Sequence, residues 1–149
     1  MSVLTNASGA EFLPPEVIVV DDEEALLAGA IPVLSRVMPD ANITGFIKAS
    51  EAIDYTLKNQ VDIVFLDIEL GRTSGLDLCS TLTEINPLIN VIFLTAYPDY
   101  AIDAWGTSAC GFLLKPLKEE DVRTQLMKLR HHPGIITGSS DGSEADTDE

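Results

Sequence analysis

The sequence predicts an α/β fold in which a five-stranded parallel sheet is covered by helices on both faces. Short apolar runs alternate five times with segments whose apolar residues recur at helical spacing. These runs contain almost no polar residues, which is typical of parallel strands buried on both faces. With 149 residues, the chain is long enough for one domain with a substantial core.

The first two strands and helices are indicated by the first third of the chain. The run "EVIVVDDEE" predicts a buried strand that ends in acids, and "NITGFIKAS" predicts the second strand. The helix between them is indicated by apolar residues at steps of four, three and four: Leu27, Ile31, Leu34 and Met38. Pro32 interrupts this pattern, so we expect a bend or a later helix start. The second helix is expected in "SEAIDYTLKNQ", with Ser50 as its N-cap.

The remaining elements continue the same alternation. "VDIVFLD", "NVIFLT" and "CGFLLKP" predict the third, fourth and fifth strands. "GLDLCSTLTEI" predicts a helix with one apolar face made of Leu78, Leu82 and Ile85, and Pro87 ends it. Pro98 suits the first turn of a helix in "PDYAIDAWGTS". The last helix is expected in "KEEDVRTQLMKLRHH", with acids early and bases late, as the helix dipole favours.

Charge and composition divide the chain into three parts. Residues 139–149 hold five acids and no base, so residues 133–149 are expected to form an acidic disordered tail. Residues 1–14 are expected to form a flexible arm, which leaves 15–132 as the folded domain. The net charge is −15, or about −10 without the tail acids, which argues against a surface that binds nucleic-acid phosphates.

The chain shows no sign of a membrane or secreted protein. No apolar run reaches the roughly 18 residues that span a bilayer, and no basic segment precedes an apolar one at the N-terminus. Cys79 and Cys110 both lie among apolar residues and are expected to be small buried hydrophobes. These features favour a reduced, cytoplasmic setting.

Polar residues end four of the five predicted strands. In parallel sheets of this kind, ligands bind at the carboxyl ends of the strands. The strand-terminal residues are Asp21 and Asp22, Asp67, Thr95 and Lys115. Each has an ordinary structural explanation when taken alone, such as a helix cap or a solvated strand end. Their convergence on one edge of one sheet instead predicts a functional site.

The chemistry of this set favours phosphoryl transfer. Three crowded carboxylates, from Asp21, Asp22 and Asp67, repel one another unless a cation lies among them, and oxygen ligands suit Mg²⁺. The ammonium of Lys115 and the hydroxyl of Thr95 can bind a tetrahedral anion. A carboxylate that is ionised at neutral pH can act as a nucleophile without a general base. We therefore expect Asp67 to form an aspartyl-phosphate.

The segments that carry these residues resemble a known family. "VIVVDDEE", "VDIVFLDIELGRTSGLDL", "VIFLTAY" and "CGFLLKPL" are similar to the motifs of bacterial response-regulator receiver domains, over residues 16–132. "LTAYPDYAIDAW" followed by "GFLLKPL" is most similar to the receivers of LytTR-type regulators. The resemblance implies a flavodoxin-like sheet with strand order 2-1-3-4-5 and a switch in a two-component system. The chain would promote its own phosphorylation and dephosphorylation rather than turn over a substrate.

The resemblance also implies roles for individual residues. Asp67 would accept a phosphoryl group from a histidine kinase or a phosphotransfer protein. Asp22 would bind Mg²⁺ directly, Asp21 would lie nearby and often act through water, and the backbone carbonyl of Glu69 would be a further ligand. Thr95 and Lys115 would contact the phosphoryl group. Thr95 would also move with the phosphoryl group, and Phe112, at the aromatic switch position, would turn inward and reshape the face made by the fourth helix, the fifth strand and the fifth helix. The alternative interpretation of Phe112 is an ordinary core aromatic.

Two features of the loops bear on the lifetime of the phosphorylated state. The family often has a proline where this chain has Gly71, which we expect to loosen the loop and expose Arg72. Glu69 and Tyr97, two residues after Asp67 and Thr95, occupy positions that tune dephosphorylation in the family. Both are bulky, so we expect slow hydrolysis.

Alternatives remain open at this point. A haloacid-dehalogenase-like phosphatase also uses an aspartate and Mg²⁺, but it places the nucleophile after the first strand with a second aspartate two residues later; here that position is Glu69. A receiver-like interaction module that works without phosphorylation is a third class.

The output of the switch is not fixed by the sequence. LytTR-type regulators carry a DNA-binding domain after the receiver, where this chain has only "PGIITGSSDGSEADTDE". The partner is then a missing output domain or a separate downstream protein, and phosphorylation can promote a homodimer. His131 and His132 are interpreted as cations at a helix C-terminus rather than as relay residues.

Overall fold

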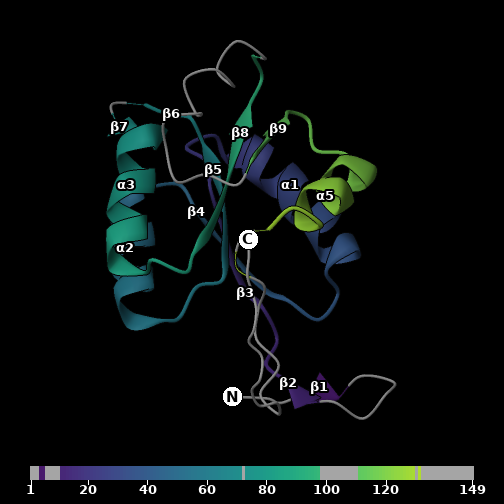
Figure 1. Cartoon of the computed structure of the whole chain (residues 1–149). Helices are drawn as coiled ribbons and strands as arrows, with labels where there is room; N and C mark the ends of the chain where they lie inside the picture. The colour runs from purple at the N-terminus through teal and green to yellow at the C-terminus, as the bar shows by residue number, and fades with distance from the viewer. Residues whose placement is uncertain (1–3, 6–10, 72, 98–110, 130, 132–149) are drawn as a thin grey trace.

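A five-stranded parallel sheet forms the centre of the molecule in the computed structural model (Figure 1). The structure describes residues 4–5, 11–71, 73–97, 111–129 and 131. The strands, in spatial order, are β4 (Asn42–Phe46), β3 (Glu16–Val20), β5 (Ile63–Asp67), β8 (Asn90–Thr95) and β9 (Gly111–Leu114). All neighbouring strands in this sheet run parallel. The predicted flavodoxin-like order 2-1-3-4-5 is therefore confirmed.

Helices cover both faces of the sheet (Figure 1). They are α1 (Glu24–Val37), α2 (Ala49–Lys58), α3 (Gly75–Ile85) and α5 (Glu119–Leu126). Helices α2 and α3 lie on one face, and α1 and α5 lie on the other. The helix predicted in "PDYAIDAWGTS" lies outside the described residues.

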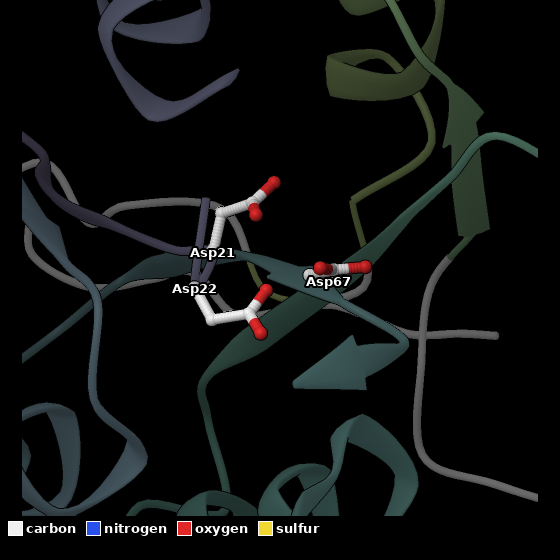
Figure 2. Close-up of side chains that lie close together, drawn as sticks. All are labelled: Asp21, Asp22 and Asp67. Carbon is white, nitrogen blue, oxygen red and sulfur yellow. The ribbon is translucent and has the colours of Figure 1, made fainter. Parts of the chain in front are cut away.

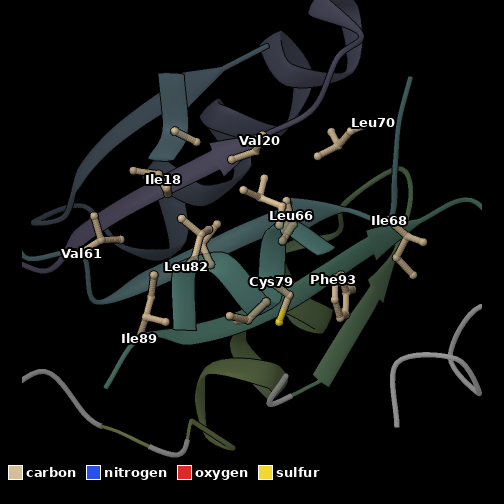
Figure 3. Packing of buried hydrophobic residues seen from close by; sticks show 14 residues of the cluster. Ile18, Val20, Val61, Leu66, Ile68, Leu70, Cys79, Leu82, Ile89 and Phe93 are labelled. Carbon is tan, nitrogen blue, oxygen red and sulfur yellow. The ribbon is translucent and has the colours of Figure 1, made fainter. Parts of the chain in front are cut away.

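The strands bury side chains on both faces because alternate residues point in opposite directions. In β3, Ile18 and Val20 join the apolar cluster under α2 and α3 (Figure 3), whereas Val17 and Val19 join the cluster under α1 and α5. Cys79 is buried in the first cluster, as predicted, and Cys110 lies outside the described residues. The two clusters hold the strand ends in fixed register, so the edge that carries the polar residues has a rigid support.

Three predictions about helix ends need correction. Helix α1 starts at Glu24 and runs through Pro32, so a late start is wrong; the proline is exposed, where hydration can replace the missing backbone bond. Helix α2 already starts at Ala49 after an extended Lys48, so Ser50 lies within its first turn and is not the N-cap. Helix α5 ends at Leu126, so His131 is not a helix-terminal cation; His132 lies outside the described residues.

Two small antiparallel sheets were not predicted. Strands β1 (Leu4–Thr5) and β2 (Glu11–Phe12) pair with each other away from the central sheet, within the arm that the sequence predicts to be flexible (Figure 1). Strands β6 (Glu69–Leu70) and β7 (Thr73–Ser74) form a hairpin directly after β5. The predicted acidic tail lies outside the described residues. Within the described part of the chain, no helix has the length and apolar character to cross a membrane.

Candidate functional site

Three carboxylates gather at the carboxyl ends of β3 and β5 (Figure 2). Asp21 and Asp22 follow β3, and Asp67 is the last residue of β5. One oxygen from each of the three lies within 4.8 Å of the others. Asp21 and Asp67 are 2% and 6% exposed, whereas Asp22 is exposed. The apolar strands therefore hold two acids in buried positions and leave a third at the surface.

Lys115 connects two of these acids. It directly follows β9, and its Nζ lies 2.8 Å from Asp21 Oδ2 and 3.2 Å from Asp67 Oδ1. The backbone N–H of Lys115 donates to the carbonyl of Thr95 at the end of β8, over 2.8 Å. The predicted lysine thus lies against the carboxylates because β9 is parallel to β8, which is parallel to β5.

The charges in this site shift the affinity of its groups for protons. Burial, and then the charge of Asp21, raise the pKa of Asp67 from 3.8 to about 6, although Lys115 and the N–H of Glu69 act in the opposite direction. Burial alone would lower the pKa of Lys115, but its bonds and charge interactions with Asp21 and Asp67 outweigh burial and raise it. One ammonium therefore does not fully offset the negative charge gathered here.

The donor set fits a hard divalent cation. All three side chains offer carboxylate oxygens, which Mg²⁺ and Ca²⁺ prefer. An additional positive charge would also relieve the repulsion that raises the pKa of Asp67. The exposure of Asp22 leaves one side of the cluster open to water, and Mg²⁺ usually keeps several waters.

The hydroxyl of Thr95 is buried beside this cluster and is held by the following backbone. Thr95 Oγ1 accepts from the N–H of Tyr97 at 3.0 Å and donates to the Tyr97 carbonyl at 3.2 Å. Asp67, Thr95 and Lys115 all line one open pocket of about 830 Å³. Glu69 and Tyr97 line the same pocket, and both are exposed. The pocket is wide enough for an approaching phosphate group.

Helix α3 begins against the end of β5. The N–H of Gly75 donates to the carbonyl of Ile68 at 2.7 Å, and the Ser74 side chain caps α3 by accepting from the N–H of Leu76 at 3.1 Å. A Cβ on Gly75 would overlap the carbonyl oxygen of Asp67 and lie 2.7 Å from the Cα of Ile68. Only glycine allows this approach, so Gly75 fixes the position of the Asp67 backbone.

The structure brings together most of the predicted site residues. Asp21, Asp22, Asp67, Thr95 and Lys115 meet at one edge, as the strand pattern predicted. Glu69 lies beside them, and its N–H donates to Asp67 Oδ1 at 3.2 Å; the ligand role of its carbonyl stays a prediction. Phe112 is half-buried and packs against the cluster that contains its register partner Phe93.

Two glycines of the site were not recognised as such from the sequence. Gly75 could have been suspected because "SG" precedes the apolar periodicity of α3. Gly71 has a φ of 59° and directly follows strand β6; its expected loosening of the loop stays a prediction. Arg72 lies outside the described residues.

A strand order of this kind, with a buried aspartate, two adjacent acids and a lysine at the carboxyl edge, defines a class of signalling domain. Residues 17–127 match the response regulator receiver domain, and the chain belongs to this family. It is a receiver domain of two-component signal transduction.

The chain is similar to several transcriptional and sensory regulators. It is 38% identical over 117 residues to the transcriptional regulatory protein BtsR of Salmonella typhi, covering 77% of this chain and 48% of the relative. It is 34% identical over 116 residues to the sensory transduction protein LytT of Bacillus anthracis, covering 77% and 47%. The chain thus spans about half the length of these relatives.

Solved structures of similar fold include receivers with bound ions. A response regulator from Burkholderia pseudomallei, solved with a phosphorylated aspartic acid, a calcium ion and citrate, has a TM-score of 0.66 and 24% identity, covering 78% of this chain and 66% of that one. This likeness concerns the fold of the two chains.

Proposed function

We propose that this chain is a phosphorylation-activated switch in which Asp67 accepts a phosphoryl group from a histidine kinase or a phosphotransfer protein, with Mg²⁺ at the acidic cluster. The observation that carries the proposal is the meeting of Asp21, Asp22 and Asp67 within 4.8 Å, with Lys115 paired to two of them. A phosphatase of the haloacid-dehalogenase class is not favoured, because the chain belongs to the receiver family.

Each residue of the site would have a distinct role in the phosphoryl transfer. An oxygen of Asp67 attacks the phosphorus, a new P–O bond forms, and the P–N bond of the phosphohistidine donor breaks with its electrons going to the imidazole nitrogen. Lys115 already pairs with Asp67 and would also pair with the incoming phosphoryl group. The Thr95 hydroxyl can exchange its bond to the Tyr97 carbonyl for one to a phosphoryl oxygen. When bound, Mg²⁺ supplies positive charge that offsets the charge of the transferred group.

Output from the switch belongs to the same proposal. Receiver domains interact with kinases and output domains, and relatives about twice as long as this chain are transcriptional or sensory regulators. Movement of Thr95 on phosphorylation would draw Phe112 inward and reshape the face around β9 and α5. That face would then contact an output domain, a downstream protein or a second copy of the chain.

Intact mass spectrometry tests the phosphorylation step. After incubation with Mg²⁺ and acetyl phosphate, the parent chain should gain the mass of one phosphoryl group, because Asp67 is ionised and paired with Lys115. The Asp67→Asn variant should gain none. Asp77→Asn, which changes an exposed acid of α3 that does not line the pocket, should gain the group as the parent does. An unmodified parent chain, or equal labelling of Asp67→Asn, would contradict the proposal.

A further inference from the structure

The loop after Asp67 is more tightly organised than its sequence suggests. Glu69 pairs with Ser74 and Leu70 with Thr73 in the β6–β7 hairpin. The N–H of Gly75 closes the base of the hairpin by donating to the Ile68 carbonyl at 2.7 Å. The pairing and this hydrogen bond connect the hairpin to the end of β5 and the start of α3.

Gly71 directly follows β6 and lies next to the acidic cluster. Its φ of 59° is left-handed, a conformation that side chains disfavour by about 1–2 kcal/mol. A Cβ at this position would lie 3.3 Å from Asp22 Oδ2, and Gly71 and Asp22 line the same pocket. Since a carbon–oxygen approach of 3.3 Å is tighter than most, one of the two groups would have to move by a few tenths of an ångström.

Asp22 is the group that would yield. The hairpin is held by its pairing and by Gly75, whereas Asp22 is exposed and its carboxylate can turn toward solvent. We propose that Gly71 is a positioning residue for the cation site: because it has no side chain, Asp22 keeps a carboxylate orientation that suits a small octahedral ion. This inference rests on the proposed function, which places Mg²⁺ at the cluster.

Cation selectivity separates this role from a general structural one. Mg²⁺ demands near-ideal octahedral geometry, whereas Ca²⁺ accepts irregular arrangements. A displaced Asp22 should therefore weaken Mg²⁺ binding more than Ca²⁺ binding. A variant that merely loosens the fold would weaken the binding of both ions by the same factor.

The test is calorimetric titration of the full chain with MgCl₂ and, separately, with CaCl₂. In Gly71→Ala, the Kd for Mg²⁺ should rise roughly tenfold, the low end of the effect that residues outside the direct ligand shell have on metal affinity. The Kd for Ca²⁺ should rise by a smaller factor. Gly29→Ala is the matched control, because a Cβ at Gly29 meets no atom within 4 Å, and its affinities should equal those of the parent.

A second variant separates the effect of the added Cβ from the effect of backbone strain. Asparagine tolerates positive φ better than alanine and adds the same Cβ, so Gly71→Asn should fold as the parent and also lose selectivity for Mg²⁺. The role of Gly71 would be overturned if Gly71→Ala raised the Kd for both ions by the same factor. It would also be overturned if Gly71→Asn bound Mg²⁺ with the affinity of the parent. If the parent chain binds neither ion, the cation site and the proposed function fail together with it.

Discussion

Asp67 is the residue where stability and the proposed function oppose each other. Burial and the charge of Asp21 raise its pKa to about 6, so the folded protein holds a proton on Asp67 more tightly than the unfolded chain does. A folded-state pKa above the unfolded value gives stability that is present below about pH 4 and is lost as the pH rises through about 6. At neutral pH, the ionised carboxylate that phosphoryl transfer requires is therefore destabilising.

The Asp67→Asn variant should be more stable than the parent in the absence of divalent cations. At pH 7, the gain in the free energy of unfolding should be on the order of 2 kcal/mol, because the variant has no charge to bury. At pH 4, the difference should largely disappear, since Asp67 is then protonated in the parent. Urea unfolding in EDTA at both pH values measures this.

The control for this prediction is Asp77→Asn, whose carboxylate is exposed on α3. It should change the free energy of unfolding by little at either pH. A parent chain that is as stable as Asp67→Asn at pH 7, or a difference that does not depend on pH, would show that burial does not destabilise the Asp67 charge.

Tyr97 is expected to lengthen the lifetime of the phosphorylated state. It is exposed at the rim of the pocket, and its backbone is fixed by two hydrogen bonds to the Thr95 hydroxyl. Its ring can hinder the approach of the hydrolytic water to Asp67. Tyr97→Ala should therefore lose its phosphoryl group several-fold faster than the parent, as followed by intact mass over time. Loss within seconds from the parent chain itself would contradict hindered access.

At the scale of elements, the junction between β5 and α3 depends on Gly75. The atoms that a Cβ would meet there belong to the backbone of Asp67 and Ile68, which the sheet holds in place. Gly75→Ala should lower the free energy of unfolding by about 1–3 kcal/mol, as overpacking usually does. It should also slow phosphorylation by acetyl phosphate, because the end of β5 must shift.

Gly29→Ala is again the matched comparison for this change. It adds the same methyl group at an open site within α1, where alanine favours the helix by roughly 0.5–1 kcal/mol. Thermal unfolding of the two variants should therefore give shifts of opposite sign. A Gly75→Ala variant with parental stability and parental phosphorylation rate would show that α3 can move away from β5 without consequence.

The end of the described chain after α5 is held by one buried side chain. Asn90, the first residue of β8, is fully buried, and its Oδ1 accepts from the N–H of His131 at 2.8 Å. Its Nδ2 donates to the carbonyl of Asp62 at 3.0 Å and also to the carbonyl of His131. This amide therefore ties the segment after α5 to the amino-terminal edge of the sheet.

Asn90→Ala should release this segment. The backbone groups of half-buried His131 lose their partner, which should lower the free energy of unfolding by about 1 kcal/mol. Hydrogen exchange of the His131 amide should become at least tenfold faster, whereas amides within β5 should keep their relative order of protection. Unchanged protection of His131 would mean that other contacts hold it.

At the scale of the whole molecule, the sheet and its polar edge could be predicted because both follow from burial. Strands covered on two faces must be apolar along their length, so the polar residue that ends each run is conspicuous in the sequence. Burial therefore predicts Asp67, Thr95 and Lys115 as residues of the polar edge. It also explains why α3 and β8 were predicted with the bounds that the structure shows.

The structural features that the sequence does not predict depend on contacts between residues far apart in the chain. The sequence does not reveal that Lys115 bridges Asp21 and Asp67, or that Asn90 binds His131 beyond a helix that ends five residues earlier. The β6–β7 hairpin has strands of two residues each, too short for an alternating pattern to emerge. The proposed role of Gly71 near Asp22 rests on a φ angle and a distance, neither of which composition encodes.

The attachment of His131 to Asn90 has a practical consequence for protein engineering. Asn90 and Thr95 are the two ends of β8, so the anchor and the pocket that Asp67 lines are separated by the length of that strand, about 16 Å. A fluorescent protein or a foreign effector module fused after residue 131 would start from the edge opposite the pocket. We therefore expect chimeric sensors built on this receiver to carry a cargo at that point without covering Asp67.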